Sequence, residues 1–472
     1  MTTLHYIMIV LEVLVIFNLI IGVHELGHFL AAKWRGLKID RFAIWFGKPI
    51  WKRKIRGVEY ALGWIPAGGY VALPQMATME AIEGKSDTPV EQLPNVSPLD
   101  KIIVAFAGPL FSFLLAVIFA VVVWQVGKPS NESETPTQIG YVDPTGPAWQ
   151  AGLRPGDVIQ EIDGHPVNHF SAMSQDSITW RIVTSENPKI EIKYLRDGVS
   201  AMAYVVPTNL PTKWYERKSL HKIIIGPAYP SSIAGIISNS PAELAGLRTN
   251  DEIMAIDDQR IYSPATVLEI QDELTNGPLK PVTFTVRRDN KEFRCTLLAQ
   301  KPVQPTNAPP LFGFVFWDGS PHEALSFPNP LDQIRSSAGM IFATFETVFS
   351  PKSGVGLQQL GGPVMIVRVY SSMLGSENGW RRVLWFSVIL NVNLALLNML
   401  PLPVLDGGHI VLSLVEAIRR RPLSAKLLQS IQTGFAALLI AFMLYIAFFD
   451  TGDLFRSLHE NQEVQIIFAP HH

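Results

Sequence analysis

The segment "YIMIVLEVLVIFNLIIGVHELGHFLAA" (residues 6–32) decides the architecture, because it is apolar over a length that can cross a bilayer. A transmembrane helix requires about 20 predominantly apolar residues. Three further runs meet this requirement, at residues 102–126, 383–400 and 427–449. We therefore predict a polytopic α-helical membrane protein with four transmembrane helices.

The composition agrees with this class of protein. Of the 472 residues, 48% are hydrophobic and 17% are charged, whereas ordinary soluble domains carry about 25% charged residues. The net charge of −2 gives no sign of a nucleic-acid partner, and we expect none. Cys295 is the only cysteine, which excludes an intrachain disulfide and a cysteine-type zinc site.

Lysine and arginine gather in two of the loops. The basic residues after the first run are Lys33, Arg35, Lys38, Arg41, Lys48, Lys52, Arg53, Lys54 and Arg56, and those before the fourth run are Arg419, Arg420, Arg421 and Lys426. Loops rich in these residues remain in the cytoplasm. Both loops are therefore predicted to be cytoplasmic, with both termini and residues 127–380 on the other side of the membrane.

The first run ends in the pattern HExxH, formed by His24, Glu25 and His28. Residues four apart share one face of a helix, so both imidazoles can bind one zinc ion while Glu25 acts as general base on a water molecule. Each ionisable group at membrane depth costs about 2.5–3.5 kcal/mol on insertion scales. This cost favours a zinc site over the alternative, in which the histidines merely reach toward the interface.

A catalytic zinc ion usually has three protein ligands. The best candidate for the third is Asp406 in "NMLPLPVLDGGH" (398–409), since no other acidic residue lies between Glu377 and Glu416. Prolines before it end the helix, and glycines after it permit a tight turn. The predicted orientation places Asp406 on the same side of the membrane as HExxH. Asp406 could instead cap the next helix, and the two roles are compatible.

A repeat occupies the region between the second and third runs. "PAWQAGLRPGDVIQEIDG" (147–164) matches "PAELAGLRTNDEIMAIDD" (241–258) in step. The pattern resembles tandem PDZ domains, which bind an extended peptide or C-terminal tail as an added strand. We therefore predict two inserted α+β, β-rich PDZ domains at residues 128–215 and 216–305. The alternative is a pair of inert β-rich spacers.

Together these motifs resemble the site-2 proteases, which are intramembrane zinc metalloproteases, and most closely the bacterial RseP type with tandem PDZ domains. The resemblance includes "GGYVAL" (68–73), "AGPLFSFLLA" (107–116) and "LGGPVMI" (360–366). It implies a bacterial inner-membrane protein with periplasmic termini and PDZ domains. The residues it assigns are His24, His28 and Asp406 as Zn²⁺ ligands, Glu25 as catalytic base, and Asn393 and Asn398 as substrate-binding residues.

A physical reason supports the role of the two asparagines. A substrate helix must unwind before cleavage, and each backbone group freed in lipid costs several kcal/mol unless a polar group satisfies it. The alternative is that they join helices within the protein. Asn391 lies seven residues before Asn398 and shares its helical face, whereas Asn393 does not.

The remaining boundaries follow from these assignments. We expect helix 1 at 1–34, a cytoplasmic loop at 35–100, helix 2 at 101–127, a linker and amphipathic segment at 306–380, helix 3 with the Leu-Asp-Gly motif at 381–418, helix 4 at 427–450, and a tail at 451–472. Within the loop, residues 41–73 are predicted to form a β-hairpin with a glycine-rich return. The resemblance implies that this segment approaches the site and pairs with substrate. Alternatively, it is a basic loop on anionic lipid.

The predicted function is cleavage of transmembrane segments of single-pass membrane proteins, such as an anti-sigma factor or remnant signal peptides, with the PDZ domains filtering substrates. The segment at residues 74–100 is an insertion relative to the RseP-type pattern. The rival is a membrane-anchored PDZ adaptor with a structural or vestigial zinc site. The intact Glu25 weighs against it, because a structural site needs no base. A metal transporter is a weaker alternative, because it would not need HExxH beside two peptide-binding domains.

Overall fold

The computed structural model describes residues 3–76, 96–131, 134, 136–171, 173–317, 324–420, 425–460 and 466–470. The chain divides into two compact units, which are described separately. The membrane unit comprises Met1–Lys128, Phe327–Phe342 and Leu360–Thr451, and the β unit comprises Pro129–Ser326, Ala343–Gln359 and Gly452–His472. Most of the predicted insertion at residues 74–100 lies outside the described residues.

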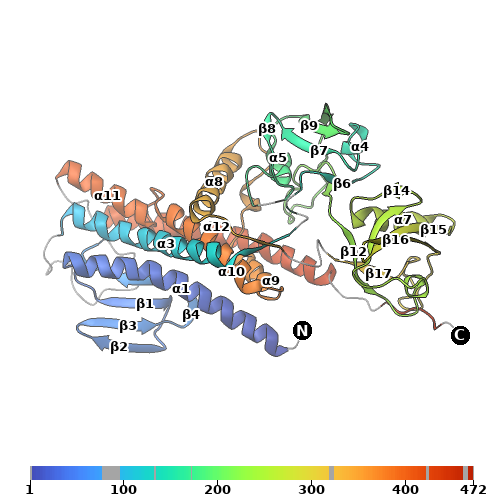
Figure 1. Cartoon of the computed structure of the whole chain (residues 1–472). Helices are drawn as coiled ribbons and strands as arrows, with labels where there is room; N and C mark the ends of the chain where they lie inside the picture. The colour runs from blue at the N-terminus through green and yellow to red at the C-terminus, as the bar shows by residue number, and fades with distance from the viewer. Residues whose placement is uncertain are drawn as a thin grey trace. The chain divides into compact units, whose positions relative to one another are not determined.

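Among the described residues, four helices are long and apolar enough to cross a membrane, as predicted. They are α1 (Thr3–Arg35), α3 (Pro98–Val126), α10 (Gly379–Asn398) and α12 (Ala425–Glu460). Both α1 and α10 pack against α3 (Figure 1). At Gly27 of α1, a Cβ atom would lie 2.4 Å from the carbonyl oxygen of Ala107, so the missing side chain lets α1 and α3 approach closely.

A four-stranded sheet follows α1 in the membrane unit. Its strands are β1 (Arg41–Phe46), β2 (Trp51–Ile55), β3 (Val58–Leu62) and β4 (Ile65–Ala72), in the order β2-β3-β1-β4. β2 and β3 form a hairpin, β1 runs parallel to β3, and β4 is antiparallel to β1. The glycine-rich return is therefore a full strand at the edge of the sheet, and within the described chain no strand pairs with its outer side.

The predicted segment 381–418 forms two helices. α10 ends at Asn398, and α11 (Asp406–Arg419) begins after a short turn. The turn contains two prolines, which cannot donate backbone hydrogen bonds. A Cβ atom at Gly407 would lie 2.3 Å from the Met399 carbonyl oxygen, so the turn requires glycine there. The Lys101–Glu416 ion pair, with Nζ and Oε2 2.8 Å apart, joins α11 to α3.

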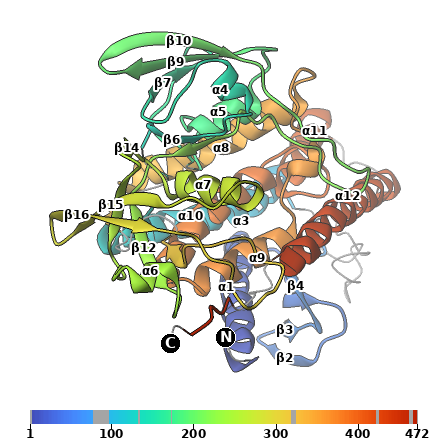
Figure 2. The same cartoon turned by 90° about the vertical axis from the view of Figure 1, so that its right-hand side faces the viewer.

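The repeat forms two β domains in the β unit (Figure 2). The first contains β6 (Ile139–Val142), α4 (Pro147–Gln150), β7 (Val158–Ile162), β8 (His165–Pro166), α5 (Ile178–Thr184), β9 (Ile190–Arg196), β10 (Val199–Val205) and β11 (Ile225–Pro227). The second contains β12 (Ser231–Ile236), α6 (Pro241–Leu244), β13 (Glu252–Ile256), β14 (Gln259–Arg260), α7 (Pro264–Asn276), β15 (Val282–Arg288), β16 (Lys291–Leu297) and β17 (Phe314–Phe316). Corresponding motifs therefore form corresponding elements.

Each β domain has its own hydrophobic core. Ile223 belongs to the core of the first domain, and Phe312 belongs to that of the second. Both lie beyond the ends predicted at residues 215 and 305. The remaining elements are β5 (Lys128–Ser130), β18 (Ala324–Ser326), α8 (Pro330–Phe349), a short 3₁₀ helix (Leu357–Gln359) and α9 (Pro363–Leu374).

Candidate metal centre

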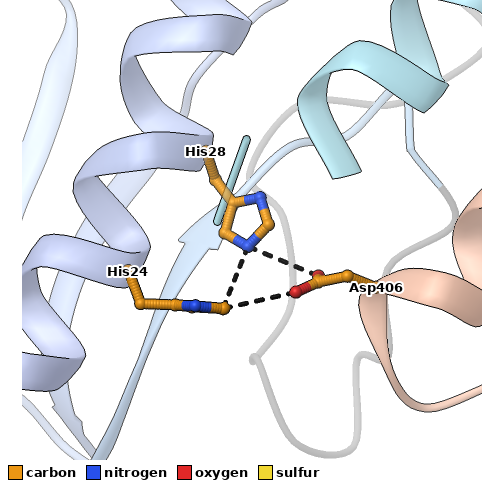
Figure 3. Close-up of side chains that lie close together, drawn as sticks. All are labelled: His24, His28 and Asp406. Carbon is orange, nitrogen blue, oxygen red and sulfur yellow. Dashed lines mark hydrogen bonds and ion pairs between the residues drawn. The ribbon is translucent and has the colours of Figure 1, made fainter. Parts of the chain in front are cut away.

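Three potential metal ligands converge in the membrane unit. His24 and His28 lie one turn apart on α1, and Asp406 is the first residue of α11. The Nε2 atoms of the histidines are 3.3 Å apart, and each lies 3.3 Å from an oxygen of Asp406 (Figure 3). Their side chains are 10%, 12% and 17% exposed, respectively. The structure thus brings together all three residues predicted as zinc ligands.

The spacing of these atoms fits a zinc ion. Tetrahedral zinc binds nitrogen and oxygen at about 2.0–2.1 Å, which separates neighbouring ligand atoms by about 3.3 Å. In addition, Oδ2 of Asp406 is buried, and its contact with Nε2 of His24, 3.3 Å away, does not have the geometry of a hydrogen bond. A buried carboxylate oxygen normally has a partner. A cation between the three side chains would supply it, so the residues present fit zinc.

Two groups on α3 orient the histidine rings. Nδ1 of His28 lies 2.8 Å from the carbonyl oxygen of Val104. A carbonyl only accepts, so Nδ1 carries the proton and Nε2 of the neutral ring is free to bind a metal. Nδ1 of His24 lies 3.0 Å from Oγ of Ser112, which is fully buried. At Gly108, a Cβ atom would lie 2.1 Å from Nε2 of His28, so glycine makes room for the ring.

A cavity of about 370 Å³ opens beside the three ligands. Its lining includes Glu25, Asn398, His409 and the β4 residues 68–71. Glu25 packs against β4, since a Cβ atom at Gly69 would lie 3.0 Å from its Cγ. The general base predicted from HExxH therefore faces the same space as the candidate ligands, beside the edge strand of the sheet.

Comparison with known proteins identifies the family. The sequence model of peptidase family M50 matches residues 12–442. The chain belongs to this family. It is 28% identical to a Neisseria meningitidis protein named as a predicted zinc metalloprotease, over 92% of this chain and 96% of that one. It is 26% identical to protease RseP of Yersinia pestis, over 93% and 96%. Identity to the regulator of sigma E protease of Haemophilus influenzae is 28%, over 91% and 96%.

Membership of M50 confirms the predicted resemblance and makes the chain a membrane zinc metalloprotease. The relatives and the four apolar helices indicate a multi-pass protein of the bacterial inner membrane. An enzyme is therefore favoured over the adaptor and the transporter that the sequence left as alternatives.

The three asparagines of α10 occupy different environments. Asn398 lines the cavity, whereas Asn393 and Asn391 are not among its lining residues. Asn391 is fully buried and donates from Nδ2 to the carbonyl oxygen of Ser387, 2.8 Å away. The Oδ1 atoms of Asn391 and Asn393 are buried without a described hydrogen-bond partner. The structure thus brings only Asn398 of the two predicted substrate-binding asparagines to the M50 site.

Sequence reasoning missed the α3 groups around the histidines. Ser112 and Gly108 stand out only as a hydroxyl and a missing side chain in an apolar helix. Such serines commonly bond to the carbonyl of their own preceding turn. The pattern therefore gave no reason to pair Ser112 with His24.

Proposed function

We propose that this M50 protein is a zinc endopeptidase that cleaves within transmembrane segments of single-pass membrane proteins. His24, His28 and Asp406 would hold the ion. The mutual spacing of about 3.3 Å between the three ligand atoms carries this proposal. Zinc, when bound, supplies a Lewis acid for the scissile carbonyl and makes water acidic enough to attack near neutral pH.

Glu25 would take the proton from the attacking water and pass it to the leaving amine. Its position in the cavity wall, next to the candidate ligands, supports this role. Asn398, in the same wall, would hydrogen-bond to substrate backbone freed by unwinding. Asn393 remains a predicted substrate-binding residue, which would require a rearrangement of α10 to reach the cavity.

The edge strand β4 would hold the substrate. Residues 68–71 of β4 line the cavity, and its outer side has no neighbouring strand in the described part of the chain. An extended peptide can add to such an edge through backbone hydrogen bonds. Pairing would fix the scissile bond relative to Glu25 and exclude unproductive orientations.

We further propose that the two β domains are PDZ domains outside the cytoplasm and that they filter substrates. The repeated motif, its corresponding elements and the separate cores support their identity. The basic loops support the orientation, with both termini outside the cytoplasm. Because one relative is named a regulator of sigma E protease, an anti-sigma factor is a reasonable substrate class, beside remnant signal peptides.

Cleavage of a single-span test substrate by purified protein in detergent tests the enzymatic proposal. Glu25→Gln and chelation should each abolish cleavage, because one removes the base and the other removes the ion. Glu12→Gln is the matched control, since Glu12 is an exposed carboxylate of the same helix. Cleavage that survives Glu25→Gln would contradict the assigned role of Glu25.

A separate experiment tests the filter. Replacing residues 129–317 with a short linker should allow cleavage of substrates that still carry bulky external domains. The rate for trimmed substrates should remain similar, because the candidate metal centre lies within the membrane unit. Unchanged discrimination between the two substrates would refute filtering by the β domains.

A further inference from the structure

Residues 466–470, which follow the fourth span in the chain, pack against the second β domain. The backbone N–H of Ile467 donates to the carbonyl oxygen of Gln304 at 2.9 Å. The carbonyl oxygen of Ile467 accepts from the N–H groups of Val303 and Gln304 at 2.7 and 3.2 Å. The segment therefore adds to residues 303–304 as an antiparallel bridge. Such pairing gives affinity through the main chain without specifying a sequence.

Phe468 provides the side-chain contact. It is 2% exposed, whereas Ile467 beside it is 39% exposed. Gly313 has a φ of +88° and carries no Cβ atom, and a Cβ there would lie 3.4 Å from Cε2 of Phe468. The same Cβ would lie 2.0 Å from that of Ser240, the N-cap residue of α6. The ring of Phe468 is thus enclosed beside Gly313, which has no side chain of its own.

We propose that the second β domain carries a peptide-binding site at residues 303–304 and Gly313, which residues 466–470 occupy in cis. Its ligand class is an extended apolar peptide with one aromatic side chain that enters the domain. A partner with the same chemistry would displace the segment. The match to the family model ends at residue 442, before the occupying segment.

This site lies away from α7, the longer helix of the domain. Figures 1 and 2 place the C-terminal segment and α7 on opposite sides of the second β domain. The contacts of Phe468 with Gly313, next to the start of α6, agree with this placement. A ligand bound beside α7 would therefore leave the site of Phe468 accessible.

Peptide binding in trans provides the first test. The probe is a fluorescent peptide, VQIIFAP, which reproduces residues 464–470. A chain ending at residue 460 should bind it saturably in detergent. The intact chain should bind at least tenfold more weakly, because a tethered competitor acts at an effective concentration of about millimolar. Alanine in place of the phenylalanine should weaken binding at least tenfold, whereas alanine in place of the preceding isoleucine should have less effect. Equal binding to both chains, or none to the shortened chain, would overturn the proposal.

Hydrogen exchange in the intact protein gives a second test that does not depend on truncation. Phe468→Ala should accelerate exchange of the Val303 and Gln304 amides at least tenfold, because both donate to the segment. Ile467→Ala is the matched control, since it keeps the backbone bonds and removes a partly exposed side chain. Unchanged protection in Phe468→Ala would show that the aromatic side chain does not hold the segment, and the proposal would fail.

Discussion

Buried carboxylates in the two units have opposite surroundings. In the β unit, Asp157 and Asp251 are each 1% exposed. Each accepts two hydrogen bonds from one arginine, Arg196 or Arg288, at 2.6–2.7 Å and a third from the backbone of its own turn. In the membrane unit, the two oxygens of Asp406 each lie 3.3 Å from a histidine Nε2, and no arginine or lysine pairs with them among the described residues. A buried carboxylate held by an arginine stabilises a fold, whereas one that faces two imidazoles at this spacing is arranged to bind a cation.

The largest expected effect tests whether Asp406 binds a metal ion. Asp406→Asn should lower cleavage by at least about 10³-fold and reduce bound zinc, because an amide keeps the shape but loses the charge. The fold should remain intact. Metal analysis by mass spectrometry and the cleavage assay measure both quantities. Full zinc occupancy in Asp406→Asn would show that Asp406 is not a zinc ligand.

The contribution of a buried, arginine-paired carboxylate to stability is tested by Asp251→Ala. The change removes the carboxylate that accepts from Arg288 and from the Arg248 N–H, and should destabilise the second β domain by about 2–4 kcal/mol. Zinc content should not change. Hydrogen exchange of β13 and β15 measures the effect. Asp258→Asn is the control, because its ion pair with Arg294 is exposed and is expected to contribute less than about 1 kcal/mol, and asparagine tolerates the left-handed backbone at this position. Equal effects of the two substitutions would remove the distinction between the two units.

A third change tests how far the metal centre depends on α3. Ser112→Ala removes the partner of His24 Nδ1 and should weaken zinc binding by about 10–100-fold, as loss of such supporting hydrogen bonds commonly does. Ser337→Ala is a suitable control, since this buried hydroxyl bonds to its own helix at Gln333. Zinc affinity is measured by competition with a chelating dye. Similar affinities for the two variants would mean that Ser112 does not orient the ring.

The sequence predicted those features that a local pattern determines. The helical period places His24 and His28 on one face, and the isolation of Asp406 among apolar residues marked it as a third ligand. The structure brings these residues together. Ser112, by contrast, acts across a helix–helix contact that no spacing in the sequence specifies. The pairing of Ile467 with Gln304 likewise joins distant parts of the chain and depends on tertiary packing.

The repeat shows the same limit of sequence reasoning. Its shared motif predicted corresponding elements in the two domains. The ends of the two domains were harder to predict from the sequence. Ile223 and Phe312 enter the cores from segments that follow proline-rich linkers. A short apolar segment after a linker does not reveal which core it joins. Strand β4 was similarly predicted as a return of the hairpin, since its glycines weaken the usual strand pattern.

The smallest expected effect concerns Glu269, a carboxylate that is only partly buried. Burial, followed by the nearby charges of Glu273 and Asp143, raises the pKa of Glu269 on α7. A raised pKa in the folded state means that folding favours the protonated form. The resulting stability is present below the ordinary pKa of 4.5 and is lost as the pH rises through the raised value. Glu269→Gln should therefore stabilise the second β domain slightly at neutral pH, by less than about 0.5 kcal/mol, since the site is largely solvated.

The measurement is the stability of the second β domain between pH 4 and pH 8 in the intact protein, followed by hydrogen exchange corrected for the intrinsic rate. The wild-type protein should lose stability relative to Glu269→Gln as the pH rises. Glu292→Gln, at an exposed position of the same domain, should leave the profile of the wild type unchanged. A Glu269→Gln profile parallel to that of the wild type would mean that partial burial without a cationic partner is tolerated here at no cost. The contrast between Asp251 and Asp406 would then depend on the partners of each carboxylate, which are an arginine for Asp251 and two imidazoles for Asp406.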